Sequence, residues 1–119
     1  MKGKHRIGFS YACNGIKEVF KSEINFRLHI ISTIIVISAG LLFQLSPIEW
    51  AFIFFCIGIV LVAELLNSAI EKAMDYIKPE IHPTAKVIKD ISAGAVLIAA
   101  ITAAIIGTII FLPKISNYF

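Results

Sequence analysis

Charged residues are scarce in this chain of 119 residues, because Asp, Glu, Lys and Arg together make up only 16% of it. Hydrophobic residues make up 58%, whereas soluble domains average roughly 45–50%, and the mean hydropathy is +0.86. Each helix of a soluble bundle needs a polar face toward water. The apolar run over residues 91–112 has no such face, which argues against a soluble helical bundle.

Cysteine is also rare, since the chain holds only Cys13 and Cys56. We expect one near a membrane surface and the other inside the lipid, so we predict neither a disulfide nor a zinc motif. The chain lacks the glycine-rich loop of P-loop proteins and the catalytic-loop signature of protein kinases. It has no aromatic and basic surface typical of RNA binding, so we expect no nucleic-acid partner despite the net charge of +3.

The hydrophobic residues collect in three blocks, and a membrane span needs about 20 such residues. We therefore predict an all-α integral membrane protein. A single domain covers residues 1–119, and its three transmembrane helices lie at about 26–45, 49–77 and 86–112. Such thin helices bury little surface within one chain, so we also expect a homo-oligomer.

The segment before the first span predicts a further helix. Residues 4–22 can form an apolar side and a charged side, which is typical of an amphipathic helix lying in the membrane interface. Asn14 and Gly15 weaken this helix in its middle, where we expect a kink or a break. Near the third span, Thr84 is the expected N-cap of a helix that begins at about residue 85.

The basic residues predict the orientation. Ten of the eleven lysines and arginines lie before the first apolar block or between the second and third blocks, and only Lys114 follows the third block. Basic residues favour the cytoplasmic side of a membrane. We therefore place the N-terminus in the cytoplasm and the C-terminus outside.

Polar residues form a stripe along the second span. A helix turns by about 100° per residue, so Glu64, Asn67, Glu71 and Asp75 lie on one face. An acidic residue at the end of an apolar run is costly and often marks a functional site. Structural roles remain open, because Asn67 can join two helices, and Glu71 and Asp75 can each pair with a nearby lysine.

Further polar residues belong to the same leaflet in this topology, namely Glu23, Glu80, His82, Lys89 and Asp90. Carboxylates beside a lysine suit Mg²⁺ and phosphate groups, and a partly buried carboxylate can take a proton from an alcohol. The set therefore indicates ATP-dependent phosphorylation of a lipid alcohol. Two alternatives are a small transporter with a proton relay and a membrane adaptor without catalytic activity.

The stripe also carries a family resemblance. The segment from Glu64 to Asp75, ELLNSAIEKAMD, resembles the signature of the prokaryotic diacylglycerol kinase family. Residues 89–97 and 23–29 are similar to that family as well, and the resemblance extends from about residue 6 to residue 112. Within the family, residues 12–15 and 25–29 resemble the undecaprenol kinase branch.

The resemblance implies a homotrimer in the bacterial cell membrane, with Mg²⁺ and ATP bound in active sites between subunits. It implies Glu64 as the general base, with Glu23 and Glu71 holding Mg²⁺. The nucleotide would contact both metal ligands and Tyr11, Glu80, His82, Lys89 and Asp90. The lipid headgroup would lie near Glu64, Asn67, Asn14, Asn25 and Arg27, some of which would order the site, whereas Asp75 receives no role.

Two departures bear on the lipid acceptor. Cys13 and Asn14 replace a Trp-Lys pair of the diacylglycerol-specific members, and Ala93 stands where those members carry a serine. The resemblance therefore favours undecaprenol over diacylglycerol as the acceptor, and the diacylglycerol kinase reading stays as the alternative.

Overall fold

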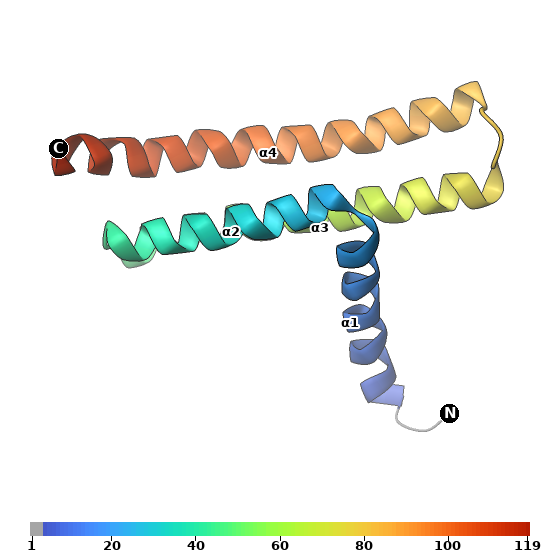
Figure 1. The fold of residues 1–119 in the computed structure, drawn as a ribbon, viewed down its shortest axis with the longest axis horizontal. Helices are drawn as coiled ribbons and strands as arrows, with labels where there is room; N and C mark the ends of the chain where they lie inside the picture. Colours follow the sequence, from blue (N-terminus) through green and yellow to red (C-terminus); the bar gives the residue numbers. More distant parts are fainter. Residues whose placement is uncertain (1–3) are drawn as a thin grey trace.

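The computed structural model describes residues 4–119, with side chains from Gly8 onward, so residues 1–3 of the predicted domain lie outside the described residues. It holds four helices, α1 (Lys4–Ser22), α2 (Ile24–Leu42), α3 (Pro47–Ile77) and α4 (Pro83–Tyr118). In Figure 1, α2, α3 and α4 run side by side, and α1 leaves the bundle at a steep angle. The last three helices are long and apolar enough to cross a membrane, which confirms the predicted all-α membrane fold.

The expected break at Asn14 and Gly15 is wrong. Helix α1 runs continuously from Lys4 to Ser22. A glycine inside a helix costs only about 1 kcal/mol relative to alanine, which is too little to interrupt an otherwise regular helix of 19 residues.

The predicted start of the last helix is also wrong. Helix α4 begins at Pro83, and His82 rather than Thr84 is its N-cap. The Nδ1 atom of His82 accepts a hydrogen bond from the backbone N–H of Thr84 at 3.1 Å. Proline suits the first helical position because it needs no hydrogen-bond partner there. The helix then continues past Pro113 to Tyr118, beyond the predicted end near residue 112.

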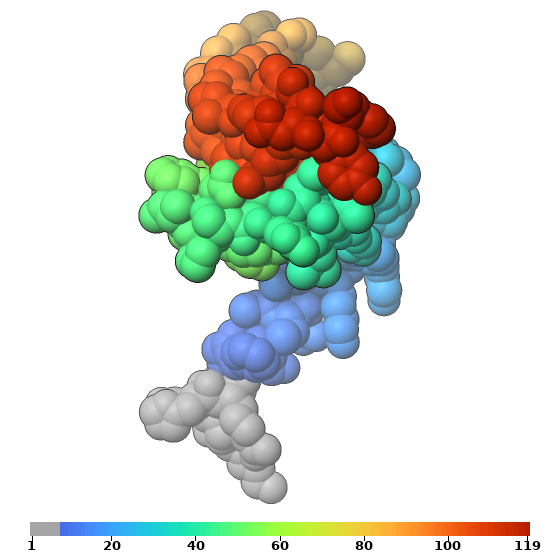
Figure 2. Space-filling model, turned by 90° about the vertical axis from the view of Figure 1, so that its left-hand side faces the viewer, coloured from blue at the N-terminus to red at the C-terminus, as the bar shows by residue number. Residues whose placement is uncertain are grey.

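The end of the bundle at the α2–α3 turn is the well-packed end. Leu45, Ile53 and Ile110 form a buried cluster, against which Trp50 packs. A Cβ atom added at Gly40 would lie 2.6 Å from Cη2 of Trp50, so only glycine fits between the two helices here. Figure 2 views the molecule from this end and shows the C-terminal part of α4 resting on α2 and α3, with α1 projecting away from them.

Polar contacts also stabilise this end of the bundle. Ser46 caps α3 because its Oγ accepts from the N–H of Glu49, while Glu49 Oε1 accepts from the N–H of Ser46 at 2.9 Å. The Nζ atom of Lys114 on α4 lies 3.1 Å from the same Glu49 oxygen. Outside this cluster many large apolar side chains are exposed along all three long helices, as expected of helices that face lipid or other copies of the chain.

Candidate active site

Glu64 is the buried centre of the polar stripe on α3. Its exposed fraction is only 5%, and its Oε1 atom lies 3.6 Å from Nε2 of His29 on α2. The negative charges of Glu23 and Glu71 also act on its carboxylate. The fold therefore holds one acidic group between α2 and α3, with a histidine as its partner.

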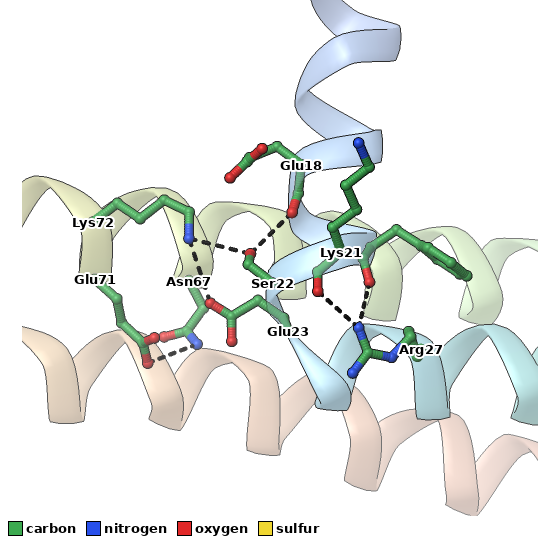
Figure 3. A network of polar contacts seen from close by, with 9 residues as sticks. Glu18, Lys21, Ser22, Glu23, Arg27, Asn67, Glu71 and Lys72 are labelled. Atoms are coloured by element: carbon green, nitrogen blue, oxygen red, sulfur yellow. Dashed lines mark hydrogen bonds and ion pairs between the residues drawn. The ribbon is translucent and has the colours of Figure 1, made fainter.

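Glu23 lies at the junction of α1 and α2, where the backbone is extended. Figure 3 shows Lys72 of α3 reaching this junction. Its Nζ atom lies 3.7 Å from Oε1 of Glu23 and donates a hydrogen bond of 3.3 Å to Oγ of Ser22. Lys72 thus connects the polar stripe on α3 to the C-terminal end of α1.

Arg27 holds the end of α1 from the other side. Its Nη1 atom donates hydrogen bonds to the backbone carbonyl oxygens of Phe20 at 2.7 Å and Lys21 at 2.9 Å (Figure 3). These carbonyls belong to the last turn of α1, where intrahelical donors are missing. Arg27 therefore fixes the direction in which α1 leaves the bundle.

Asn67 and Glu71 lie one turn apart on α3, beside Glu23 and Lys72 in Figure 3. The Nδ2 atom of Asn67 donates to Oε1 of Glu71 at 3.3 Å. The other end of the amide, Oδ1, is buried and has no partner among the described residues. A buried acceptor without a partner is costly, so this oxygen is available to a donor or a cation from outside the chain.

The oxygen atoms at this place fit Mg²⁺ chemically. Mg²⁺ is bound by one or two carboxylates together with substrate phosphates and water, and Glu23 and Glu71 supply carboxylates next to the unpaired oxygen of Asn67. Among the residues whose side chains the structure describes, 8–119, no group of three or more His, Cys, Asp or Glu is placed to hold a metal ion.

The residues at the α3–α4 loop pair mainly with each other. Lys89 of α4 binds Asp75 of α3 through an ion pair of 2.5 Å, and Lys86 binds Asp90 at 2.6 Å. The partner of Asp75 is therefore Lys89 of α4, and not Lys72 or Lys78, the two lysines near Asp75 in the sequence. Lys89 and Asp90 lie at the same end of the bundle as the stripe, already engaged in ion pairs.

Four predicted site residues stay apart from this cluster. Tyr11, Asn14, Asn25 and Glu80 are exposed. Within residues 8–119, no side-chain hydrogen bond or ion pair joins these four residues to the stripe. Their predicted roles stay predictions.

His29 and Lys72 are the site residues that sequence reasoning missed. His29 entered only as part of the segment resembling the undecaprenol kinase branch, and Lys72 only as a possible partner of its neighbours. The signal for Lys72 was its place one residue after Glu71. The signal for His29 was a polar ring within the first apolar block, a costly position of the same kind as Glu64.

Two apolar grooves flank α3. The first, of about 600 Å³, lies between α2 and α4 and extends from His29 to Ile115. The second, of about 580 Å³, lies between α3 and α4 and includes Asn67 and Ser92. Both are lined mainly by aliphatic side chains, so each suits a hydrocarbon chain, and each has a polar residue of the site at one end.

The sequence is similar to those of known proteins over most of its length. Residues 10–111 match the family model described as prokaryotic diacylglycerol kinase. The chain is 46% identical over 107 residues to the undecaprenol kinase of Bacillus subtilis (strain 168), which covers 90% of this chain and 87% of that protein. A diacylglycerol kinase of Synechocystis is 38% identical over 92% of this chain and 63% of its own length. The diacylglycerol kinase of Escherichia coli (strain K12) is 30% identical, over 80% and 78%.

Proposed function

Because this chain belongs to the prokaryotic diacylglycerol kinase family, and is therefore a membrane lipid kinase that uses ATP, we propose that its acceptor is undecaprenol and its product undecaprenyl phosphate. The observation that carries this proposal is the 46% identity to an undecaprenol kinase over most of both chains. The diacylglycerol kinases of Synechocystis and Escherichia coli are 38% and 30% identical to this chain. Diacylglycerol remains the second candidate, whereas membership of a kinase family argues against the transporter and the adaptor.

The groove between α2 and α4 supports a lipid acceptor. It is lined by aliphatic groups and begins at His29, whose ring lies 3.6 Å from Glu64. A hydrocarbon chain in this groove would remain in apolar surroundings while its terminal hydroxyl approached the carboxylate. The groove therefore offers an acceptor alcohol a path to the buried end of the stripe.

Glu64 acts as the general base in this proposal. It removes the proton of the acceptor hydroxyl as the oxygen attacks the γ-phosphorus of ATP, and the bond from that phosphorus to the oxygen of ADP breaks. The transfer is direct and in line, so positioning and charge stabilisation supply most of the catalysis. The burial of Glu64 at 5% exposure keeps water away from the transferred group.

Glu23 and Glu71 are the proposed ligands of Mg²⁺, which when bound neutralises charge on the phosphates. Lys72 lies between these carboxylates and the end of α1 and can bind a phosphoryl oxygen. The proposed nucleotide contacts are Tyr11, Glu80, His82, Lys89 and Asp90. Asn67, Asn14 and Asn25 border the lipid headgroup, and Arg27 orders the site, since it holds the end of α1.

The proposed assembly is a homotrimer in the bacterial cell membrane, with active sites between subunits. Two observations support it. Large apolar side chains are exposed along all three spans, and helix α1, which carries the exposed Tyr11 and Asn14, leaves the bundle at a steep angle. A second copy could bring such residues to the site. The basic residues favour a cytoplasmic N-terminus and an outside C-terminus.

A direct comparison of acceptors tests the substrate. Purified protein is assayed with radiolabelled ATP against undecaprenol and diacylglycerol under matched detergent and Mg²⁺ conditions. We expect kcat/KM to be at least about tenfold higher for undecaprenol, a difference of about 1.4 kcal/mol in transition-state binding. A preference for diacylglycerol would establish the second candidate instead.

A further inference from the structure

We propose that His29 positions Glu64 and then receives from it the proton of the acceptor alcohol. This inference rests on the proposed function, because it takes Glu64 as the general base. It adds a second residue to the proton path and assigns a role to the only α2 side chain that is paired with Glu64.

The pairing of His29 with Glu64 is the first support for this proposal. Glu64 is 5% exposed, and a buried carboxylate needs a compensating partner. The titratable groups that act on it are His29 from α2, Glu23 from the α1–α2 junction and Glu71 from α3. Of these only the histidine can carry a positive charge. The charged residues of α4 nearby have other partners, because Lys89 pairs with Asp75 and Asp90 pairs with Lys86.

The distance between the two side chains is a second support. Nε2 of His29 lies 3.6 Å from Oε1 of Glu64, which is within ion-pair range but longer than a formed hydrogen bond. Catalytic hydrogen bonds are often long without substrate and tighten in the reacting complex. A small movement of either side chain would therefore bring the two atoms to proton-transfer distance.

The exposure of His29 is a third support for the proposal. The side chain of His29 is 26% exposed, compared with 6% for the side chain of Glu64, and it lines the groove between α2 and α4. The imidazole thus contacts the buried carboxylate on one side and is open to the groove on the other, so it is the more accessible of the two groups.

The proton steps balance. When the acceptor oxygen bonds to the γ-phosphorus and ADP leaves, its proton passes to Glu64. The proton then moves from Glu64 to the unprotonated Nε2 of neutral His29, which restores the carboxylate and leaves an imidazolium beside it. The imidazolium finally releases a proton to water. Imidazole suits this role because it changes charge between about pH 5 and 8.

The substitution His29→Gln tests the proposal in the purified full-length protein. Glutamine has a similar length and can donate a hydrogen bond, but it cannot take up the proton. We expect kcat to fall by roughly 10²-fold, KM for Mg-ATP to stay unchanged, and the pH–rate profile to lose the limb that depends on a neutral histidine. A wild-type kcat with a wild-type pH profile would overturn the proposal.

Ser38→Ala is the matched control. Ser38 lies on the same helix but lines neither groove, and its hydroxyl donates to the backbone carbonyl of Ile34. We expect this variant to keep the wild-type kcat and pH profile. An equal loss in both variants would show that any loss of a polar side chain from α2 lowers the rate, which also contradicts the proposal.

A double mutant separates this inference from the proposed function. If His29 acts through Glu64, then Glu64→Gln and the double variant with His29→Gln have the same low activity. A further multiplied loss would place His29 outside the path. An active Glu64→Gln would refute the general base itself, whereas an inactive Glu64→Gln with an unaffected His29→Gln would refute only the relay.

A folding control completes the experiment. Each variant is compared with the wild type by size-exclusion elution and melting temperature in the same detergent. If His29→Gln does not fold, His29→Ala is assayed with and without added imidazole. A return of activity with imidazole supports the relay, and its absence in a folded His29→Ala overturns it.

Discussion

The two ends of α3 lie in different surroundings. Near Pro47 the helix is capped by Ser46, pairs with Lys114 through Glu49 and packs against a buried aliphatic cluster. Towards Ile77 it carries the polar stripe, which begins with buried Glu64. The buried cluster of the described residues belongs wholly to the first end.

The difference indicates a division of labour along one helix. At the capped end the polar groups and side-chain shapes are matched within a single chain. At the stripe end Asn67 keeps an unpaired buried oxygen, and several carboxylates are held by exposed lysines. Such exposed pairs contribute little to stability and can be exchanged for a ligand. We therefore expect the matched contacts of the capped end to contribute mainly to stability, whereas the proposed chemistry belongs to the other end.

The largest expected effect is at the stripe end. Glu64→Gln removes the proposed base but keeps the side-chain shape, so we expect phosphorylation to fall by at least about 10²-fold with little change in melting temperature. Lipid phosphorylation by a folded oligomer measures it. Glu49→Gln at the capped end is the control and should retain full activity. An active Glu64→Gln would end the assignment of the base.

The next effect is at the capped end. Gly40→Ala would place a Cβ atom 2.6 Å from Cη2 of Trp50 and 3.0 Å from Cδ1 of Leu45. We expect this overpacking to lower the free energy of unfolding by about 1–3 kcal/mol, measured by thermal unfolding in detergent. Gly58→Ala, where no atom lies within 4 Å, should not destabilise the protein. Equal stability of the two variants would show that the Trp50 contact is unimportant.

A smaller effect tests the proposed metal site. Glu71→Gln removes one carboxylate but can still accept the hydrogen bond from Asn67. We expect the Mg²⁺ concentration for half-maximal activity to rise by about tenfold, which corresponds to about 1.4 kcal/mol. A magnesium titration measures this shift, with Glu18→Gln as the control because Glu18 is exposed. An unchanged titration curve would contradict the ligand role.

The smallest effect concerns the ion pair at the capped end. Lys114 and Glu49 are each 27% exposed and lie 3.1 Å apart. Because exposed pairs are weak and screened by salt, Lys114→Met should lower the melting temperature much less than Gly40→Ala does. High salt should remove the difference. A drop as large as that of Gly40→Ala would mean that this pair is shielded from water.

Much of the fold could be predicted because hydrophobicity in long runs is a local signal. The three apolar blocks indicate the three spans, and the confirmed helices follow them. The errors lie where weak preferences compete. Gly15 does not break α1, and His82 rather than Thr84 caps α4, since Pro83 takes the first helical position.

The site could be predicted only along single helices. The spacing of Glu64, Asn67 and Glu71 follows from helical geometry, and the Asn67–Glu71 hydrogen bond joins residues of one stripe. The pairs His29–Glu64 and Lys89–Asp75 join different helices. These pairs depend on the axial positions of α2 and α4 relative to α3. Side-chain packing sets these positions, and sequence periodicity does not describe that packing.

The length of α3 has a consequence for the surrounding membrane. Its 31 residues extend about 46 Å, whereas the hydrocarbon layer is about 30 Å thick. If the hydrocarbon layer begins at Pro47, Glu64 lies about 26 Å along the axis and inside that layer, and Glu71 lies about 36 Å along it and beyond the layer. The helix would then cross the boundary between hydrocarbon and water with one carboxylate on each side. Lipids with longer acyl chains would submerge Glu71, so the rate of the enzyme should depend on bilayer thickness.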